Sequence, residues 1–186
     1  MDALVWVFYP VFLYQRGLSL PEIGWVVGTY GFVWGGSQFF TGKLSDHIGR
    51  HPPNVWGMCL CGAGVALMTL QTSMAGWLFS AAVSGFGMAL LYPNLSAAIA
   101  DISHPNWRGS AIGIYRFWRD LGYGIGALGL GIAAHFSGSV EAAFWFVAVS
   151  MFLSAAVLWH FGSETHPRLN PMLSPAPNGR LHKPGQ

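Results

Sequence analysis

A succession of long apolar runs constrains this sequence more than any other feature. Five of them, each about as long as the roughly 20 helical residues that cross a bilayer, lie at 21–41, 54–72, 76–100, 109–136 and 140–161. Only 9% of the residues are charged, against about 25% in a soluble domain. Because the chain lacks the polar residues that a water-facing surface needs, the sequence predicts an all-α fold, a polytopic membrane helix bundle.

The two ends of the chain differ from these runs. The first apolar stretch, near 2–15, is too short to span a bilayer and lacks the basic n-region and cleavage site of a signal peptide. We therefore expect the chain to begin inside a helix whose start is missing, which gives about six transmembrane helices over residues 1–161. Residues 162–186 are rich in Pro, Asn and Ser without an apolar period, and we expect a flexible cytoplasmic tail there.

The basic residues predict which side of the membrane each connection faces. Alternate connections share a side, and one set with the C-terminal tail carries Lys43, Arg50, Arg108, Arg168, Arg180 and Lys183. The other set carries Arg16 alone. Since Lys and Arg favour the cytoplasmic side, this asymmetry predicts an integral membrane protein with both termini in the cytoplasm. Chance segregation of so few charges is the alternative interpretation.

The connection "GKLSDHIGR", residues 42–50, is a polar island between two apolar runs. We expect Gly42 to close the preceding span with a positive φ, Asp46 to meet a helix N-terminus, Gly49 to allow a tight reversal, and Arg50 to bind a carboxylate bidentately. The prolines at 52–53 suit the first turn of the next helix. A set of charge pairs that forms in one conformation only is a conformational gate; the alternative is a basic hairpin without a gating role.

The spacing of this loop is similar to a known one. Gly-x-Leu-x-Asp-x-x-Gly-Arg, here Gly42, Leu44, Asp46, Gly49 and Arg50, resembles the cytoplasmic signature loop of the major facilitator superfamily. The resemblance implies a secondary active transporter of a small molecule, working by alternating access between two six-helix halves. It implies no enzyme activity and no cofactor, and we expect a bacterial inner membrane as the location.

Other parts of the chain carry the same resemblance. Residues 92–131 are similar to the fourth and fifth helices of a six-helix half, and Glu164–Pro167 is similar to the end of a whole transporter. The resemblance thus identifies the chain as the C-terminal half, with the N-terminal half of the same protein missing, so that the fragment alone would be inactive. His47 and His51 stand at two positions that are basic in the family, which suggests a weaker or pH-dependent loop.

The fifth apolar run places charges inside a predicted membrane helix. Arg116, Arg119 and Asp120 lie two to three turns past its start, and such residues usually face a bundle interior or a wet cavity. Arg116 and Asp120 are four residues apart, so we expect them to pair on one helix face. We expect Arg119 to reach another helix or a substrate. The alternative is that the long Arg side chains extend to the interface.

Glycines follow these charges. Residues 124–129 match the dinucleotide pattern Gly-x-Gly-x-x-Gly, but they lie inside a membrane helix rather than between a strand and a helix, so we reject a nucleotide site. The small residues at Gly122, Gly126 and Gly131 predict close packing of helices instead.

A proline, Pro93, interrupts the run at 76–100 and frees a backbone carbonyl group. Its neighbours Tyr92 and Asn94 either line a cavity or satisfy that carbonyl, and we favour the second role. Proton coupling would require a buried acid, for which Asp2 and Asp120 are the candidates.

Several function classes receive little support. The net charge of +2 gives no indication of nucleic-acid binding, and neither metal-ligand spacing nor a catalytic triad pattern stands out. An intramembrane enzyme or redox subunit would need paired His residues or acids facing across the bundle. A non-catalytic scaffold or accessory subunit, or a half-transporter that associates with itself, is the main alternative to the transporter.

Overall fold

The computed structural model describes residues 1–170 and contains helices joined by short connections. In chain order these are η1 (Leu4–Phe8), α1 (Tyr9–Gln15), α2 (Leu20–Ile48), α3 (His51–Leu70), α4 (Met74–Ile102), η2 (Pro105–Trp107), α5 (Arg108–Ser137) and α6 (Val140–Phe161). The prediction of an all-α helix bundle is confirmed. Most of the predicted tail, residues 171–186, lies outside the described residues.

The predicted helix bounds agree closely with the observed ones except at one end. The run at 140–161 coincides with α6. Every end of three other runs lies within three residues of the end of its helix; these runs are 54–72, 76–100 and 109–136. The exception is α2, which continues through the polar island to Ile48. With 29 residues it is about 43 Å long, longer than the roughly 30 Å hydrocarbon core of a bilayer.

Within residues 1–170, three helices are long and apolar enough to cross a membrane, namely α3, α4 and α6. The sequence predicted five such spans. The other two, α2 and α5, have the required length with 29 and 30 residues, but they are less apolar because the polar island extends α2 and because α5 contains three arginines and an acid.

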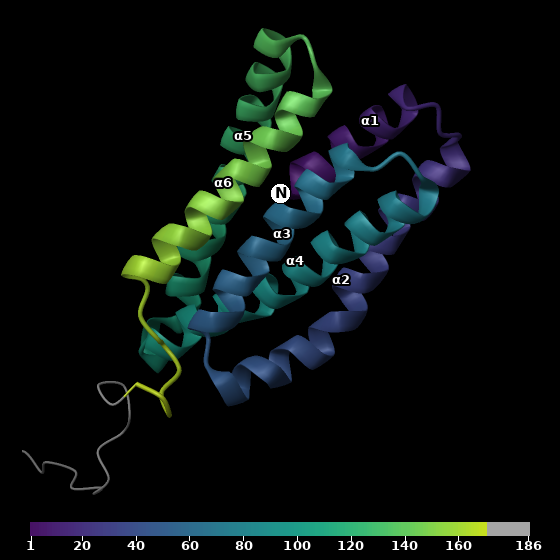
Figure 1. Cartoon of the computed structure of the whole chain (residues 1–186). Helices are drawn as coiled ribbons and strands as arrows, with labels where there is room; N and C mark the ends of the chain where they lie inside the picture. The colour runs from purple at the N-terminus through teal and green to yellow at the C-terminus, as the bar shows by residue number, and fades with distance from the viewer. Residues whose placement is uncertain (171–186) are drawn as a thin grey trace, which may run out of the picture.

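The helices pack in an order that differs from their order along the chain. Helix α3 lies between α4 and α6, α4 lies between α2 and α3, and α5 packs mainly on α6 (Figure 1). The connections 49–50 and 103–107 lie with the segment 162–170 at one end of the bundle, and the remaining connections lie at the other (Figure 1). This separation matches the two predicted sets of connections.

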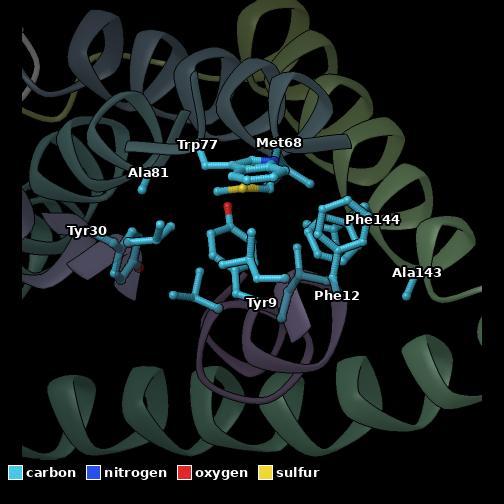
Figure 2. Close-up of a cluster of buried hydrophobic side chains, with 14 of the residues drawn as sticks. Tyr9, Phe12, Tyr30, Met68, Trp77, Ala81, Ala143 and Phe144 are labelled. Atoms are coloured by element: carbon cyan, nitrogen blue, oxygen red, sulfur yellow. The ribbon is translucent and has the colours of Figure 1, made fainter. Parts of the chain in front are cut away.

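The hydrophobic core forms around α1, where aromatic side chains from several helices meet (Figure 2). Tyr9 stacks on Phe144 of α6 with ring centroids 5.4 Å apart, and Phe12 lies 4.8 Å from the same ring. The Tyr9 hydroxyl shares a 3.3 Å hydrogen bond with Ser84 of α4. The short first helix is therefore held inside the bundle by α4 and α6.

Glycines allow α3 and α4 to approach each other closely. A Cβ atom at Gly57 would lie 2.8 Å from the Gly87 carbonyl oxygen, and one at Gly87 would meet Gly57 at the same distance. On the other side of α4, a Cβ atom at Gly85 would lie 2.6 Å from the Tyr30 carbonyl oxygen of α2. Small residues thus bring helices together at α4 rather than at α5, where they were predicted to do so.

Candidate functional site

The connection between α2 and α3 consists of two residues, Gly49 and Arg50. Gly49 has φ +95°, a left-handed conformation that favours glycine. The prediction that Gly49 provides the tight reversal is confirmed, and the prolines at 52–53 do fall in the first turn of α3. Gly42 does not close a span as predicted, because it lies within α2 and has no positive φ.

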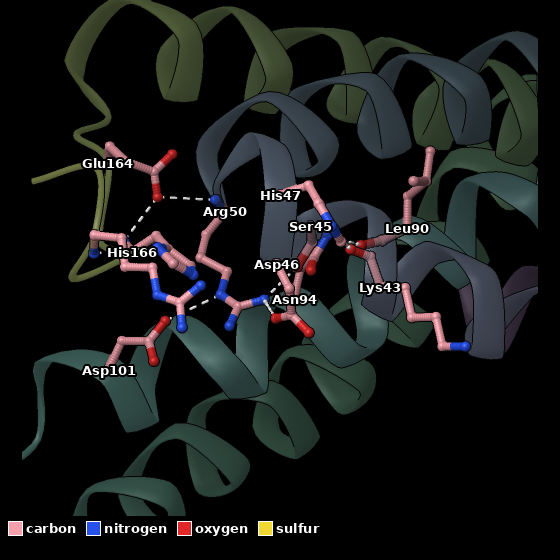
Figure 3. Close-up of polar contacts among 11 residues, drawn as sticks. Lys43, Ser45, Asp46, His47, Arg50, Leu90, Asn94, Asp101, Glu164 and His166 are labelled. Atoms are coloured by element: carbon pink, nitrogen blue, oxygen red, sulfur yellow. Dashed lines mark hydrogen bonds and ion pairs between the residues drawn. The ribbon is translucent and has the colours of Figure 1, made fainter.

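The Arg50 side chain joins the ends of α2 and α4 (Figure 3). Its Nη1 lies 2.8 Å from Asp46 Oδ1 on α2 and its Nε lies 3.0 Å from Asp101 Oδ2 on α4, while Nη1 also donates a short hydrogen bond to Ser45. Arg50 is only 9% exposed. Partial burial opposes the charge, but Asp101 and Asp46 outweigh it and raise the pKa of Arg50.

Glu164 completes this group from the other end of the chain. Its carboxylate accepts hydrogen bonds from the backbone N–H groups of Arg50 at 2.8 Å, His51 at 3.1 Å and His166 at 2.7 Å (Figure 3). Partial burial by itself would raise the pKa of Glu164, but these backbone donors lower it below its ordinary value. An acid at the N-terminus of α3 is favourable because free N–H groups and the helix dipole meet there.

Two predictions about this group are wrong. Asp46 does not contact a helix N-terminus, since it pairs with Arg50 one turn further along, and Glu164 occupies the N-terminus of α3 instead. Arg50 does not bind one carboxylate bidentately but bridges two, Asp46 and Asp101. The start of the predicted flexible tail is also held, because Asn170 Nδ2 donates a 2.7 Å hydrogen bond to the Glu164 carbonyl oxygen.

His47 and His51, which stand where the resemblance predicts basic residues, make different contacts: His47 bonds within its own helix and His51 bonds to another helix. His47 Nδ1 lies 2.8 Å from the Lys43 carbonyl oxygen within α2. His51 Nε2 lies 2.9 Å from the carbonyl oxygen of Leu158 near the end of α6. His51 therefore adds a second link between α3 and α6 beside that of Glu164.

On α5 the predicted pairing of charges is wrong. Asp120 accepts a 2.8 Å hydrogen bond from Arg119 rather than from Arg116. Arg116 is exposed, and no residue in the described part of the chain forms an ion pair with it. Arg119 reaches another helix as predicted, since it donates a 3.2 Å hydrogen bond to the Tyr92 hydroxyl of α4 and lies over the Tyr92 and Tyr123 rings.

Arg119, Tyr92 and Tyr123 border a cavity of about 200 Å³ that is lined by residues 1–2 and by α3, α4, α5 and α6. Its polar residues are Asp2, Tyr92, Tyr115, Arg119, Tyr123 and Ser154, and methionine and leucine side chains cover most of the remaining wall. The cavity combines an apolar wall with a few polar groups, as sites for small molecules do. Tyr92 lines it, whereas Asn94 is fully buried elsewhere in α4.

The backbone break at Pro93 is repaired by a residue that the sequence did not indicate. Pro93 lacks the N–H group that would bind the Ala89 carbonyl oxygen. Thr41 Oγ1 of α2 donates a 2.6 Å hydrogen bond to that oxygen, whereas the Asn94 side chain donates to the carbonyl oxygen of Leu90 at 2.7 Å. The favoured role of Asn94 is thus carried out by Thr41.

Gly122, Gly126 and Gly131 of α5 do not pack closely against another helix of this chain, whereas a Cβ atom at Gly129 would lie 3.1 Å from the Phe146 ring of α6. A Cβ atom at Gly122, Gly126 or Gly131 would meet nothing within 4 Å. Leu130 is the one buried residue of α5. Most of this helix therefore presents an uncovered surface, which corrects the prediction of close packing within the chain.

Asp101, Ser45, Glu164 and Thr41 are the site residues that sequence reasoning missed. Asp101 had a signal, because it begins the short Asp-to-Gly connection in the stretch similar to known transporters. Within residues 1–170 there is no group of three or more His, Cys, Asp or Glu residues placed to hold a metal ion.

Comparison with known proteins identifies the family of this helix bundle. A sequence model of the Major Facilitator Superfamily matches residues 1–182. The chain belongs to the major facilitator superfamily. Members of this superfamily are membrane transporters, and the long apolar helices of this chain fit an integral membrane protein.

Several relatives from this superfamily align with most of this chain but with only part of their own length. An uncharacterised MFS-type transporter of Salmonella typhimurium is 28% identical over 73% of this chain and 34% of its own length. Multidrug resistance protein MdtH of Aeromonas hydrophila is 30% identical over 69% and 34%, and inner membrane transport protein YajR of Escherichia coli is 30% identical over 72% and 29%. The chain spans about a third of the length of these relatives.

A solved structure has the same superfamily architecture. A peptide transporter POT, crystallised in complex with sulfate, superposes with a TM-score of 0.71 at 25% identity. The superposition covers 85% of this chain and 33% of the peptide transporter.

Proposed function

We propose that this chain is the C-terminal six-helix half of a secondary transporter that moves a small organic molecule by alternating access. Coverage of about a third of each relative supports a fragment of a longer transporter. The uncovered surface of α5, with Gly122 and Gly126 open to contact, supports a second half packed against it.

The Arg50 group is the observation that carries the proposed mechanism. Its ion pairs and hydrogen bonds connect the end of α2, the start of α3, the end of α4 and the segment after α6. Charge pairs of this kind hold only while the helix ends lie together, so they stabilise one conformation of the cytoplasmic side. Asp46, Asp101 and Arg50 are therefore proposed as the conformational gate.

The cavity beside Tyr92 and Arg119 is proposed as this half's share of the substrate site. A relative is named a multidrug resistance protein and another an inner membrane transport protein. We propose by analogy a small organic substrate and a bacterial inner membrane, with both termini cytoplasmic and the proton as coupling ion. The remainder of the substrate site would come from the missing half.

Transport by the full-length protein tests the gate. Ethidium is the probe, measured as flux through proteoliposomes that contain the full-length protein. Arg50→Gln should lower the flux by about tenfold or more, equivalent to about 1.4 kcal/mol, because one change removes both ion pairs. Lys43→Gln, a loss of charge within the same polar island at 42–50, should leave the flux close to wild type. Equal flux in wild type and Arg50→Gln, with equal insertion, would remove the gate from the proposal.

The coding DNA upstream of Met1 tests the missing half. An in-frame region that encodes about six further hydrophobic spans is expected. A stop codon directly before Met1 would favour the alternative, a half-transporter that associates with itself or an accessory subunit.

A further inference from the structure

Asp2 is an acid held inside the bundle by a residue of another helix. The hydroxyl group of Tyr30 donates a 3.1 Å hydrogen bond to Asp2 Oδ1, and Tyr30 is fully buried. Tyr30 lies ten residues after the start of α2 at Leu20, which is about 15 Å along the helix. Asp2 therefore sits near the middle of the roughly 30 Å hydrocarbon core.

The carboxylate also borders the cavity of about 200 Å³. Asp2 shares this wall with Tyr123 of α5, a second phenol group that interacts with it. Asp2 is the one carboxyl group in the wall of this cavity, and methionine and leucine side chains make up half of the lining residues.

The charges around Asp2 leave it without a basic side-chain partner. On its own segment, residues 1–15, Asp2 is the only charged side chain. The other helices contribute Tyr30 (α2), Cys61 (α3), Tyr92 (α4), and Tyr115, Arg119 and Tyr123 (α5). The only one of these that is a cation, Arg119, is bound by Asp120 and Tyr92, and α6 contributes the uncharged Ser154.

The backbone next to Asp2 is irregular. Residues Leu4–Phe8 form a π-helix before α1 begins. Pro10 accounts for it, because this residue lacks an N–H group and its ring clashes with the carbonyl group one turn earlier. Short π-helical turns of this kind occur frequently at functional sites.

We propose that Asp2 is the site that binds and releases the coupling proton. This inference rests on the proposed transporter function and names the residue that it requires. The proton enters from the cavity and adds to a carboxylate oxygen, which gives a neutral carboxylic acid, and it leaves by the reverse step on the other side of the membrane. Tyr30 serves both states, since a phenol hydroxyl donates to the carboxylate and accepts from the acid.

Infrared titration of the purified full-length protein in detergent tests this assignment without any substrate. Difference spectra between alkaline and acidic buffer report the C=O band of each carboxyl group that takes up a proton. Asp2→Asn should lose one such band, and Glu141→Gln, which removes an exposed acid at one end of the bundle, should keep it. Tyr30→Phe should shift the same band without removing it. Identical spectra from wild type and Asp2→Asn would overturn the assignment.

Two further measurements keep the outcome clear. If Asp2→Asn does not fold, Asp2→Glu retains the carboxyl group and should move the band, so an unchanged band in a folded Asp2→Glu protein also overturns the assignment.

In proteoliposomes, Asp2→Asn should lose ethidium flux driven by a pH gradient and keep exchange at equal pH. Loss of both in a folded variant would assign Asp2 to substrate binding instead. Absence of flux in the wild type would contradict the transporter function and leave the infrared result standing.

Discussion

Thr41 Oγ1 of α2 donates a 2.6 Å hydrogen bond to the Ala89 carbonyl oxygen of α4. That oxygen is the acceptor left without its helical partner by Pro93. One side chain thus compensates a backbone defect on a neighbouring helix, and it ties α2 to α4 close to the Arg50 group.

Thr41→Val should destabilise the protein by about 1–2 kcal/mol, because it leaves a buried carbonyl group without a partner. The change keeps the shape of the side chain, so packing is preserved. The measurement is thermal unfolding of the protein purified in detergent.

A matched control and a double variant isolate this effect. Thr29→Val removes a hydroxyl that bonds only within α2, to the Trp25 carbonyl oxygen, and should change stability by less than about 0.5 kcal/mol. Pro93→Ala restores the N–H group, so Thr41→Val should cost less in that background. An equal cost in both backgrounds would show that the hydrogen bond does not compensate Pro93.

The two acids that Arg50 bridges should contribute unequally to stability and to transport. The Asp101 side chain is 20% exposed and that of Asp46 is 60% exposed, and an exposed ion pair contributes only about 0–1 kcal/mol. Asp101→Asn should therefore lower both stability and ethidium flux of the full-length protein more than Asp46→Asn does. The reverse order would indicate that Asp46 contacts a partner outside this chain.

Glu164 should make the stability of the bundle end that carries the Arg50 group depend on pH. Its pKa is lowered in the folded protein, so its contribution is complete above the ordinary value of about 4.3 and is lost as the pH falls through the lowered pKa. Unfolding temperatures of wild type and Glu164→Gln should differ at neutral pH and converge in acid.

Glu141→Gln, on the opposite end of the bundle, provides the comparison for this pH series. It should not reproduce the convergence, since the Glu141 side chain is 46% exposed and pairs only with Arg16. A constant difference between wild type and Glu164→Gln at every pH would exclude a charged Glu164 as the stabilising group.

Gly49→Ala should destabilise the protein by more than about 1 kcal/mol. The left-handed φ of +95° disfavours a side chain, and the added Cβ atom would overlap the Glu164 carboxylate. Gly42→Ala is the control, because Gly42 lies within α2 with nothing within 4 Å of its Cβ position, and alanine is about 1 kcal/mol better than glycine in a helix. Thermal unfolding of both variants decides whether the turn lies at Gly49.

Local features of the sequence determined the helices and the reversal at Gly49. The apolar run at 140–161 coincides with α6, because lipid-facing helices must be apolar along their whole length. Gly49 and the prolines at 52–53 mark the turn. Glycine permits a positive φ and proline fixes φ at a helical value, wherever these residues occur. Such effects depend on the residue and its immediate neighbours alone.

Only the tertiary structure decided which polar groups meet. A spacing of four residues predicted a pair between Arg116 and Asp120, but Asp120 binds the adjacent Arg119, which also donates a hydrogen bond to Tyr92 on α4. The acid at the start of α3 is not Asp46 but Glu164, 114 residues from Arg50.

The predicted packing glycines of α5, Gly122, Gly126 and Gly131, are open, and glycines of α3 and α4 bring those two helices together. Sequence spacing specifies which residues share a helix face but not what that face contacts. Contact partners follow from how whole helices pack, and a charged side chain binds whichever opposite charge or free N–H group that packing places within reach.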